Sequence, residues 1–208
     1  MTKQYFTSDE LESKDITFQA DLGAGQTNYD ENPKRSFIDG GVKFQNHQAL
    51  FTFKGEASTD GIIESDWAIG DKSGKYYTLG IDVTSEKDES FFEQFTDALS
   101  EYVADPDYTV INPCKNGKIN LKIKFSGNKF DPRFNGLKHS VASLDDINNI
   151  IMLDTPLEIK CEFTTSFTFD NQQAKINLVV RSIDFPGQVT ITPIFQQPIS
   201  KKPKTKKD

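Results

Sequence analysis

The stretch Lys118-Ile119-Asn120-Leu121-Lys122-Ile123-Lys124-Phe125 decides the fold prediction. Its odd-numbered positions are apolar and its even-numbered positions are polar. Alternation with a period of two is typical of a strand with one buried and one solvated face. Every charge on the polar face is positive, and Phe125 falls on the apolar face by its parity. The sequence therefore predicts a strand that buries aliphatic side chains and Phe125 and turns a row of cations toward water.

The segment around this strand extends the basic character. Residues 115–138 carry seven lysines or arginines against the single acid Asp131, in a chain whose net charge is −7. One interpretation is an ordinary exposed sheet edge, where lysines discourage association with other edges. The other is a surface that follows a phosphate backbone. The loop after the strand combines Lys129 and Arg133 with the rings of Phe130 and Phe134, a pairing that single-stranded nucleic acid binding uses.

Length and composition indicate about one domain. The chain has 208 residues and 17 phenylalanines, enough to build a sizeable core. We find no signal peptide and no apolar run of the roughly 18 residues that a membrane span needs, so we expect no membrane association. The two cysteines, Cys114 and Cys161, form neither a disulfide framework nor a metal motif. We expect an intracellular protein, in the host cell cytoplasm or nucleus if the source is a virus.

The elements predicted along the chain are mostly strands. Residues 1–41 read as an N-terminal arm with short strands, residues 42–199 as the main domain, and residues 200–208 as a disordered basic tail. Ser85 begins a helix whose Phe92, Phe95, Leu99 and Tyr102 recur at helical spacing. Residues 71–74 and 127–136 read as a turn and a loop, residues 144–152 as a short helix, and residues 157–169 and 175–185 as a hairpin.

This pattern predicts a mostly β protein with one inserted α-helix. A single OB-like Greek-key barrel, the oligonucleotide-binding type, suits about five main strands. A two-sheet sandwich is the competing architecture. The chemistry of an enzyme is not indicated: His47 and His139 are isolated, and no nucleophile elbow, phosphate loop or dinucleotide motif occurs. We therefore expect no catalytic residues, no metal and no cofactor.

The order of these features resembles the replicative single-stranded DNA-binding proteins of short-tailed phages and their counterparts in large eukaryotic DNA viruses. The resemblance covers 74–185: a strand at 75–83, an aromatic-striped helix at 91–103, the lysine-rich strand and the final hairpin with Ile176-Asn177-Leu178-Val179-Val180 near its centre. It implies an oligonucleotide-binding barrel that coats single strands, with DNA contacts on Lys118, Lys122 and Lys124 and stacking rings nearby. The phage members end in an acidic segment, whereas the tail here is lysine-rich, so the roles of that segment do not carry over.

We therefore expect a non-enzymatic, sequence-independent single-stranded DNA-binding protein that acts in DNA replication, recombination or repair. Its partners would be single-stranded DNA and replication proteins, and a homodimer is compatible with this role. The alternative is a β-sandwich structural or interaction protein, such as a virion or scaffold component. The candidate nucleic-acid-binding residues are Lys118, Lys122, Lys124, Lys129, Phe130, Arg133, Phe134, Tyr77 and Lys160.

The tail prediction follows from its composition. Residues 200–208 hold five lysines and no apolar side chain, so they cannot bury enough surface to fold. Lys201-Lys202-Pro203-Lys204 fits a nuclear import signal, and a mobile cationic arm that contacts phosphates is the other interpretation.

Overall fold

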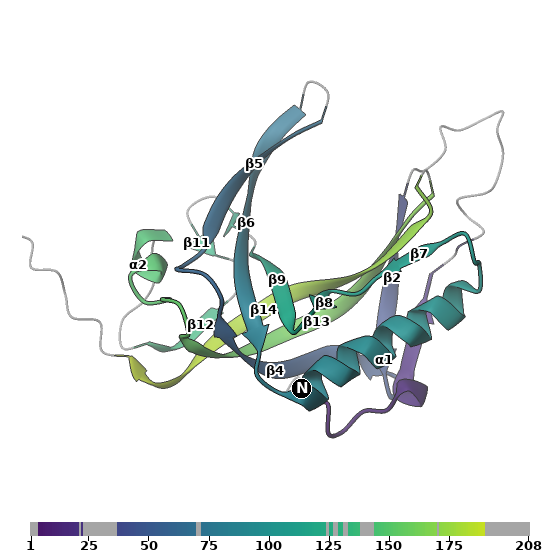
Figure 1. The fold of residues 1–208 in the computed structure, drawn as a ribbon, viewed down its shortest axis with the longest axis horizontal. Helices are drawn as coiled ribbons and strands as arrows, with labels where there is room; N and C mark the ends of the chain where they lie inside the picture. Colours follow the sequence, from purple (N-terminus) through teal and green to yellow (C-terminus); the bar gives the residue numbers. More distant parts are fainter. Residues whose placement is uncertain are drawn as a thin grey trace, which may run out of the picture.

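The computed structural model describes residues 4–20, 22, 37–69, 72–123, 125–126, 129–130, 133–137, 144–169 and 171–189. These residues form a mostly β protein with a long helix, α1 (Glu86–Val103), and a short helix, α2 (Leu144–Asn148), besides the 3-10 turn η1 (Ser13–Asp15) (Figure 1). The strands are β1 (Ile16–Gln19), β2 (Phe37–Phe44), β3 (His47–Gln48), β4 (Leu50–Ala57), β5 (Ile63–Ile69), β6 (Lys72–Val83), β7 (Thr109–Ile111), β8 (Cys114–Lys115), β9 (Lys118–Ile123), β10 (Phe125–Ser126), β11 (Lys129–Phe130), β12 (Arg133–Leu137), β13 (Pro156–Thr168) and β14 (Gln173–Val189).

The pairings of five strands close on themselves. β4 pairs with β6, β6 pairs with β9, and β13 pairs with both β4 and β14, all in antiparallel sense. β9 and β14 then meet in parallel sense, with Lys122 opposite Val179. The order around this ring is therefore β4, β6, β9, β14, β13 and back to β4.

The hairpin β13–β14 is the longest part of the sheet and supports several neighbours. The first half of β13 pairs with β4, and its second half pairs with β2. Along β13 every second side chain is buried, and Thr165 occupies a core position in this series. The Thr165 hydroxyl has no hydrogen-bond partner among the described residues. This alternation confirms the predicted strand and shows that β13 keeps one face toward the core along its whole length.

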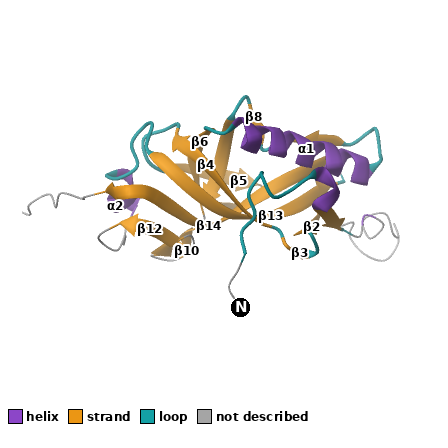
Figure 2. Cartoon of the chain, turned by 90° about the horizontal axis from the view of Figure 1, so that it is seen from below, coloured by secondary structure: helices purple, strands orange, loops and turns teal. Residues whose placement is uncertain are grey.

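Helix α1 covers the core. Ser85 caps its N-terminus by accepting a hydrogen bond from the Asp88 backbone at 3.3 Å, as its sequence predicts. The predicted apolar stripe is confirmed, because Phe92, Phe95 and Leu99 are buried. Ring contacts join Phe91, Phe92 and Phe95 of α1 to the phenylalanines of β2, β4 and β13, including a stack of Phe91 on Phe51 with ring centroids 4.6 Å apart. Figure 2 shows α1 lying along one side of the sheet, at the opposite end of the molecule from α2.

Two local predictions differ from the structure. Residues 72–74, expected in a turn, begin the long strand β6, which pairs with β5 and projects with it from the rest of the molecule (Figure 1). Part of the expected loop at 127–136 is strand: β11 pairs with β10, and β12 runs parallel to β14. In both regions tertiary pairing outweighs local turn composition.

The described part of the N-terminal segment packs onto the same core. Phe6 is buried, and its backbone donates a hydrogen bond to the Leu50 carbonyl at 2.9 Å. β1 pairs with β2, and the expected boundary after residue 41 falls inside β2. The predicted basic tail lies outside the described residues. Neither described helix has the length and apolarity that crossing a bilayer requires.

Candidate nucleic-acid interface

The polar face of β9 carries the candidate site. Its burial alternates as predicted: Ile119, Leu121 and Ile123 are buried, whereas the lysines and Asn120 between them are exposed. The Lys118 ammonium lies 2.9 Å from the Asp82 carboxylate on the neighbouring strand β6. Lys122 forms no ion pair with a described residue. Lys122 is therefore the β9 cation that is most available to an external anion.

A tight turn adds a second lysine beside Lys118. β8 and β9 form a hairpin through Asn116 and Gly117, whose φ angles are 53° and 71°. Positive φ at both central residues is typical of a type I′ turn, and Asn-Gly is its preferred sequence. The turn pairs Lys115 with Lys118 across the hairpin. Lys115 was not among the predicted site residues, although the Asn-Gly pair is a sequence signal for this arrangement.

β14 supplies a further lysine from a distant part of the chain. Because β14 lies beside β9 in parallel sense, Lys175 and Asn177 face the same hollow as the β8–β9 lysines. This lysine hollow has a volume of about 500 Å³. Its lining residues are Ile111, Asn112, Pro113, Lys115, Lys118, Asn120, Lys122, Lys175, Ile176, Asn177 and Leu178. The lining contains four lysines and no carboxylate, so the hollow is suited to anions.

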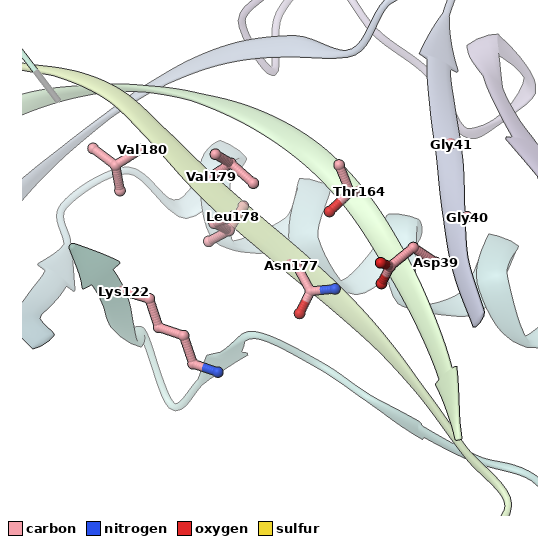
Figure 3. Close-up of a pocket in the computed structure, with 9 residues that line it drawn as sticks. All are labelled: Asp39, Gly40, Gly41, Lys122, Thr164, Asn177, Leu178, Val179 and Val180. Atoms are coloured by element: carbon pink, nitrogen blue, oxygen red, sulfur yellow. The ribbon is translucent and has the colours of Figure 1, made fainter. Parts of the chain in front are cut away.

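A second hollow adjoins the first and shares Lys122, Asn177 and Leu178 with it. We name it the Asp39 hollow; its volume is about 490 Å³. It is lined by Asp39, Gly40, Gly41, Lys122, Thr164, Asn177, Leu178, Val179 and Val180. Figure 3 shows Asp39, Thr164 and Asn177 near one another on β2, β13 and β14, with Lys122 extending from β9. The two hollows form one continuous surface across β9, β14, β13 and β2.

The tyrosine on the solvated face of β6 is Tyr76, not the predicted Tyr77, although Tyr76 lines neither hollow. Thr78 pairs with Lys122, so Tyr76, two residues earlier on β6, lies on the same face as these two residues. Tyr76 is 42% exposed. Tyr77 lies on the face of Leu79 and packs against the core, and a hydrogen bond to Glu64 raises its pKa. The sequence contains a signal for this difference: Tyr77 alternates in step with the apolar Leu79 and Ile81, whereas Tyr76 falls on the opposite face of the strand.

The predicted contact Lys160 is already neutralised within the protein. Its ammonium bonds to the Asp184 carboxylate and lies 3.3 Å from a Glu158 oxygen. The hydrogen bond to Asp184 raises the pKa of Lys160. Asn135 donates a further hydrogen bond to Asp184 at 2.6 Å. Lys160 therefore stabilises the contact between β13, β14 and β12, and its charge is not available to a ligand.

The remaining predicted residues lie on or near β10 to β12. Arg133 is exposed on β12 opposite Ser182 of β14, whereas Phe134 is half-buried against the core. Lys129 and Phe130 form β11, whose side chains are outside the described part of the structure, as are the side chain of Phe125 and all of Lys124. None of the described residues in this group lines either hollow.

The described residues form neither a metal site nor a reactive thiol site. They contain no group of three or more histidine, cysteine or acidic side chains that could hold a metal ion. Cys114 and Cys161 are buried free thiols, and burial raises the pKa of Cys114 to about 11 and that of Cys161 still further. Neither cysteine is therefore a nucleophile near neutral pH.

Comparisons of the chain with protein-family models, with curated proteins and with solved structures found no match.

Proposed function

We propose that the protein binds single-stranded DNA without sequence specificity and acts in DNA replication, recombination or repair. The observation that carries this proposal is the lysine hollow, where Lys115, Lys118, Lys122 and Lys175 converge from three strands. A fully exposed sheet edge would also present lysines, but these lysines surround a concavity between β9 and β14. Four cations around one groove attract a polyanion more strongly than the same cations spread over a convex surface.

We further propose that the five-strand ring is an OB-type barrel. Numbered along the chain, its strands follow the order 1-2-3-5-4-1, with the parallel contact between the third and the fifth. OB-folds bind oligonucleotides on the face of their second and third strands, which correspond here to β6 and β9. The proposed site shares β9 with that face and extends from β9 over β14. This agreement between topology and lysine position supports the function over the alternative of a β-sandwich interaction protein.

Binding in this proposal combines phosphate contacts with stacking. Phosphates would lie against Lys122, Lys115 and Lys175, and Lys118 would join them when its bond to Asp82 loosens. Tyr76 would stack on a base of the same strand. Successive positions on one face of a β-strand are about 7 Å apart, close to the spacing of nucleotides in an extended single strand, so a nucleotide next to one bound at Lys122 could reach Tyr76. A stacked base contributes about 1–3 kcal/mol and any base can stack, so this contact requires no particular sequence.

A fluorescence-anisotropy titration with a labelled single strand of mixed sequence tests the function. We expect saturable binding that competitor duplex displaces poorly. The slope of log affinity against log salt should lie near −2 to −3, at about 0.7 for each of three to four phosphates.

The double variant K115E/K175E should abolish this binding, whereas K14E/K87E, with the same charge change outside both hollows, should retain it. Absence of binding by the wild-type chain would refute the function and favour the interaction-protein alternative.

A further inference from the structure

The Asp39 hollow has a feature that backbone binding does not explain. Asp39 places a carboxylate in the hollow that Lys122 also lines, within the surface proposed to hold phosphates. Asp39 is exposed, and no described cation lies within ion-pairing distance of it. A carboxylate repels a phosphate backbone, so a surface built for phosphates alone would be better without it. The position of Asp39 is instead consistent with a contact to a base.

The spacing of the strands fits a flat ring. Strand pairing places Gly41, Thr164 and Asn177 in one row across β2, β13 and β14, and Asp39 lies in the next row opposite Ser166. Adjacent strands are about 4.8 Å apart and successive rows on one face are about 7 Å apart, so the backbones of Asp39 and Asn177 are separated by roughly 12 Å. Gly41 adds no side chain at the β2 end of the Thr164 row, and Val179 offers an apolar surface. The hollow can therefore admit a base edge between two polar groups.

The Asp39 carboxylate is the side chain of this hollow that accepts hydrogen bonds and does not donate them. The Asn177 amide nitrogen donates one of its hydrogens to the Ser166 hydroxyl at 3.1 Å, so the Asn177 side chain keeps a carbonyl acceptor and one N–H donor. The Thr164 hydroxyl can accept or donate. A base that carries an exocyclic amino group presents donors to the Asp39 carboxylate. Thymine presents one ring N–H between two carbonyl acceptors, which the carboxylate opposes.

Resting on the proposed DNA-binding function, we propose that the Asp39 hollow receives one base of the bound strand and favours bases with an exocyclic amino group over thymine. Lys122 lines both hollows, so a phosphate held by Lys122 brings its own nucleotide to the Asp39 hollow. The preference is superimposed on binding that is otherwise independent of sequence.

The test compares oligo-dC with oligo-dT of equal length by fluorescence anisotropy, at one salt concentration and at a slightly alkaline pH where cytosine is neutral. Both are pyrimidine strands with weak self-stacking, so their difference reports the base edge. We expect oligo-dC to bind about tenfold more tightly, because one hydrogen bond to a charged group is worth about 1.4 kcal/mol. In Asp39→Asn the ratio of the two affinities should fall to near one.

Asp82→Asn is the matched control. It makes the same charge change on the neighbouring surface and frees Lys118, so both affinities should rise by the same factor and the ratio should persist. Equal affinity of the wild-type chain for the two oligonucleotides would overturn the inference while leaving the proposed function intact. A preference for oligo-dC that survives Asp39→Asn would remove the Asp39 hollow as its source. Binding of neither oligonucleotide would overturn both proposals.

Discussion

The substitution Lys122→Gln tests the proposed interface most directly, because Lys122 lines both hollows and forms no ion pair with a described residue. The change removes one charge and keeps a polar side chain of similar length. Its side chain is exposed on the polar face of β9, so the free energy of unfolding should change by less than about 0.5 kcal/mol. Any loss of affinity then reports the interface and not the fold.

The expected loss follows from counterion release. One phosphate contact contributes about 0.7 to the slope of log affinity against log salt, and this ionic contribution vanishes near 1 M salt. Lys122→Gln should therefore weaken binding about eightfold at roughly 0.05 M salt and about fourfold at roughly 0.15 M salt. The salt slope itself should become shallower by about 0.7.

The assay is an anisotropy titration of wild type, Lys122→Gln and Lys87→Gln over several salt concentrations. Lys87 lies on α1 and is bonded to Asp9, outside both hollows, so its substitution removes the same charge without removing a proposed contact. An unchanged slope for Lys122→Gln, or an equal loss of affinity for Lys87→Gln, would refute the placement of the phosphate path along β9. A melting curve for each variant confirms that the fold is retained.

Three further predictions concern the fold itself. Phe163→Ala should lower the free energy of unfolding by about 3–5 kcal/mol in a denaturant titration, since its buried ring contacts phenylalanines of β2, β4 and α1; a loss under 1 kcal/mol would show that the core collapses around the cavity. Ser85→Ala should cost about 1 kcal/mol, because it removes the cap of α1, whereas Ser90→Ala on the exposed face of the same helix should change little; equal effects would argue against the cap. Burial would raise the pKa of Asp184, but hydrogen bonds from Lys160 and Asn135 outweigh burial and lower it. The lowered pKa contributes stability that is complete above the ordinary aspartate pKa of 3.8 and is lost as the pH falls below that value, so acid unfolding of Asp184→Asn should depend less steeply on pH than that of wild type.

Local sequence patterns predicted the elements in which a single hydrophobic periodicity runs along the whole element. The alternation in Lys118–Ile123 and in Pro156–Thr168 survives in the structure because each strand buries one face along its whole length. The α1 boundaries follow from Ser85 and from the residues around Pro106, which are local signals. Of the turn expected at 71–74, residues 72–74 are strand because β5 pairs with them, and local composition does not report such a partner.

The candidate site was predictable only in part. Lys118 and Lys122 lie where the strand pattern places them. Lys175 joins them through the parallel contact between β9 and β14, and a pairing between strands more than fifty residues apart leaves no local signal. Lys160 has the correct parity for the solvated face, but its ammonium is paired with the carboxylates of Asp184 and Glu158, and the pairing with Asp184 depends on tertiary structure.

The closure between β9 and β14 has a consequence for the dynamics of the protein. Among the described residues these strands share one residue pair, whereas β13 and β14 share eleven. A contact supported by so few backbone hydrogen bonds opens by local fluctuation more readily than the long hairpin beside it, so its amides should exchange with solvent far faster than those of β13. The lysine hollow spans this seam, with Lys122 on one side and Lys175 on the other. A polyanion bound by both lysines would stabilise the contact between β9 and β14. The extent of this stabilisation could be measured as slower amide exchange at Ile123 and Val179.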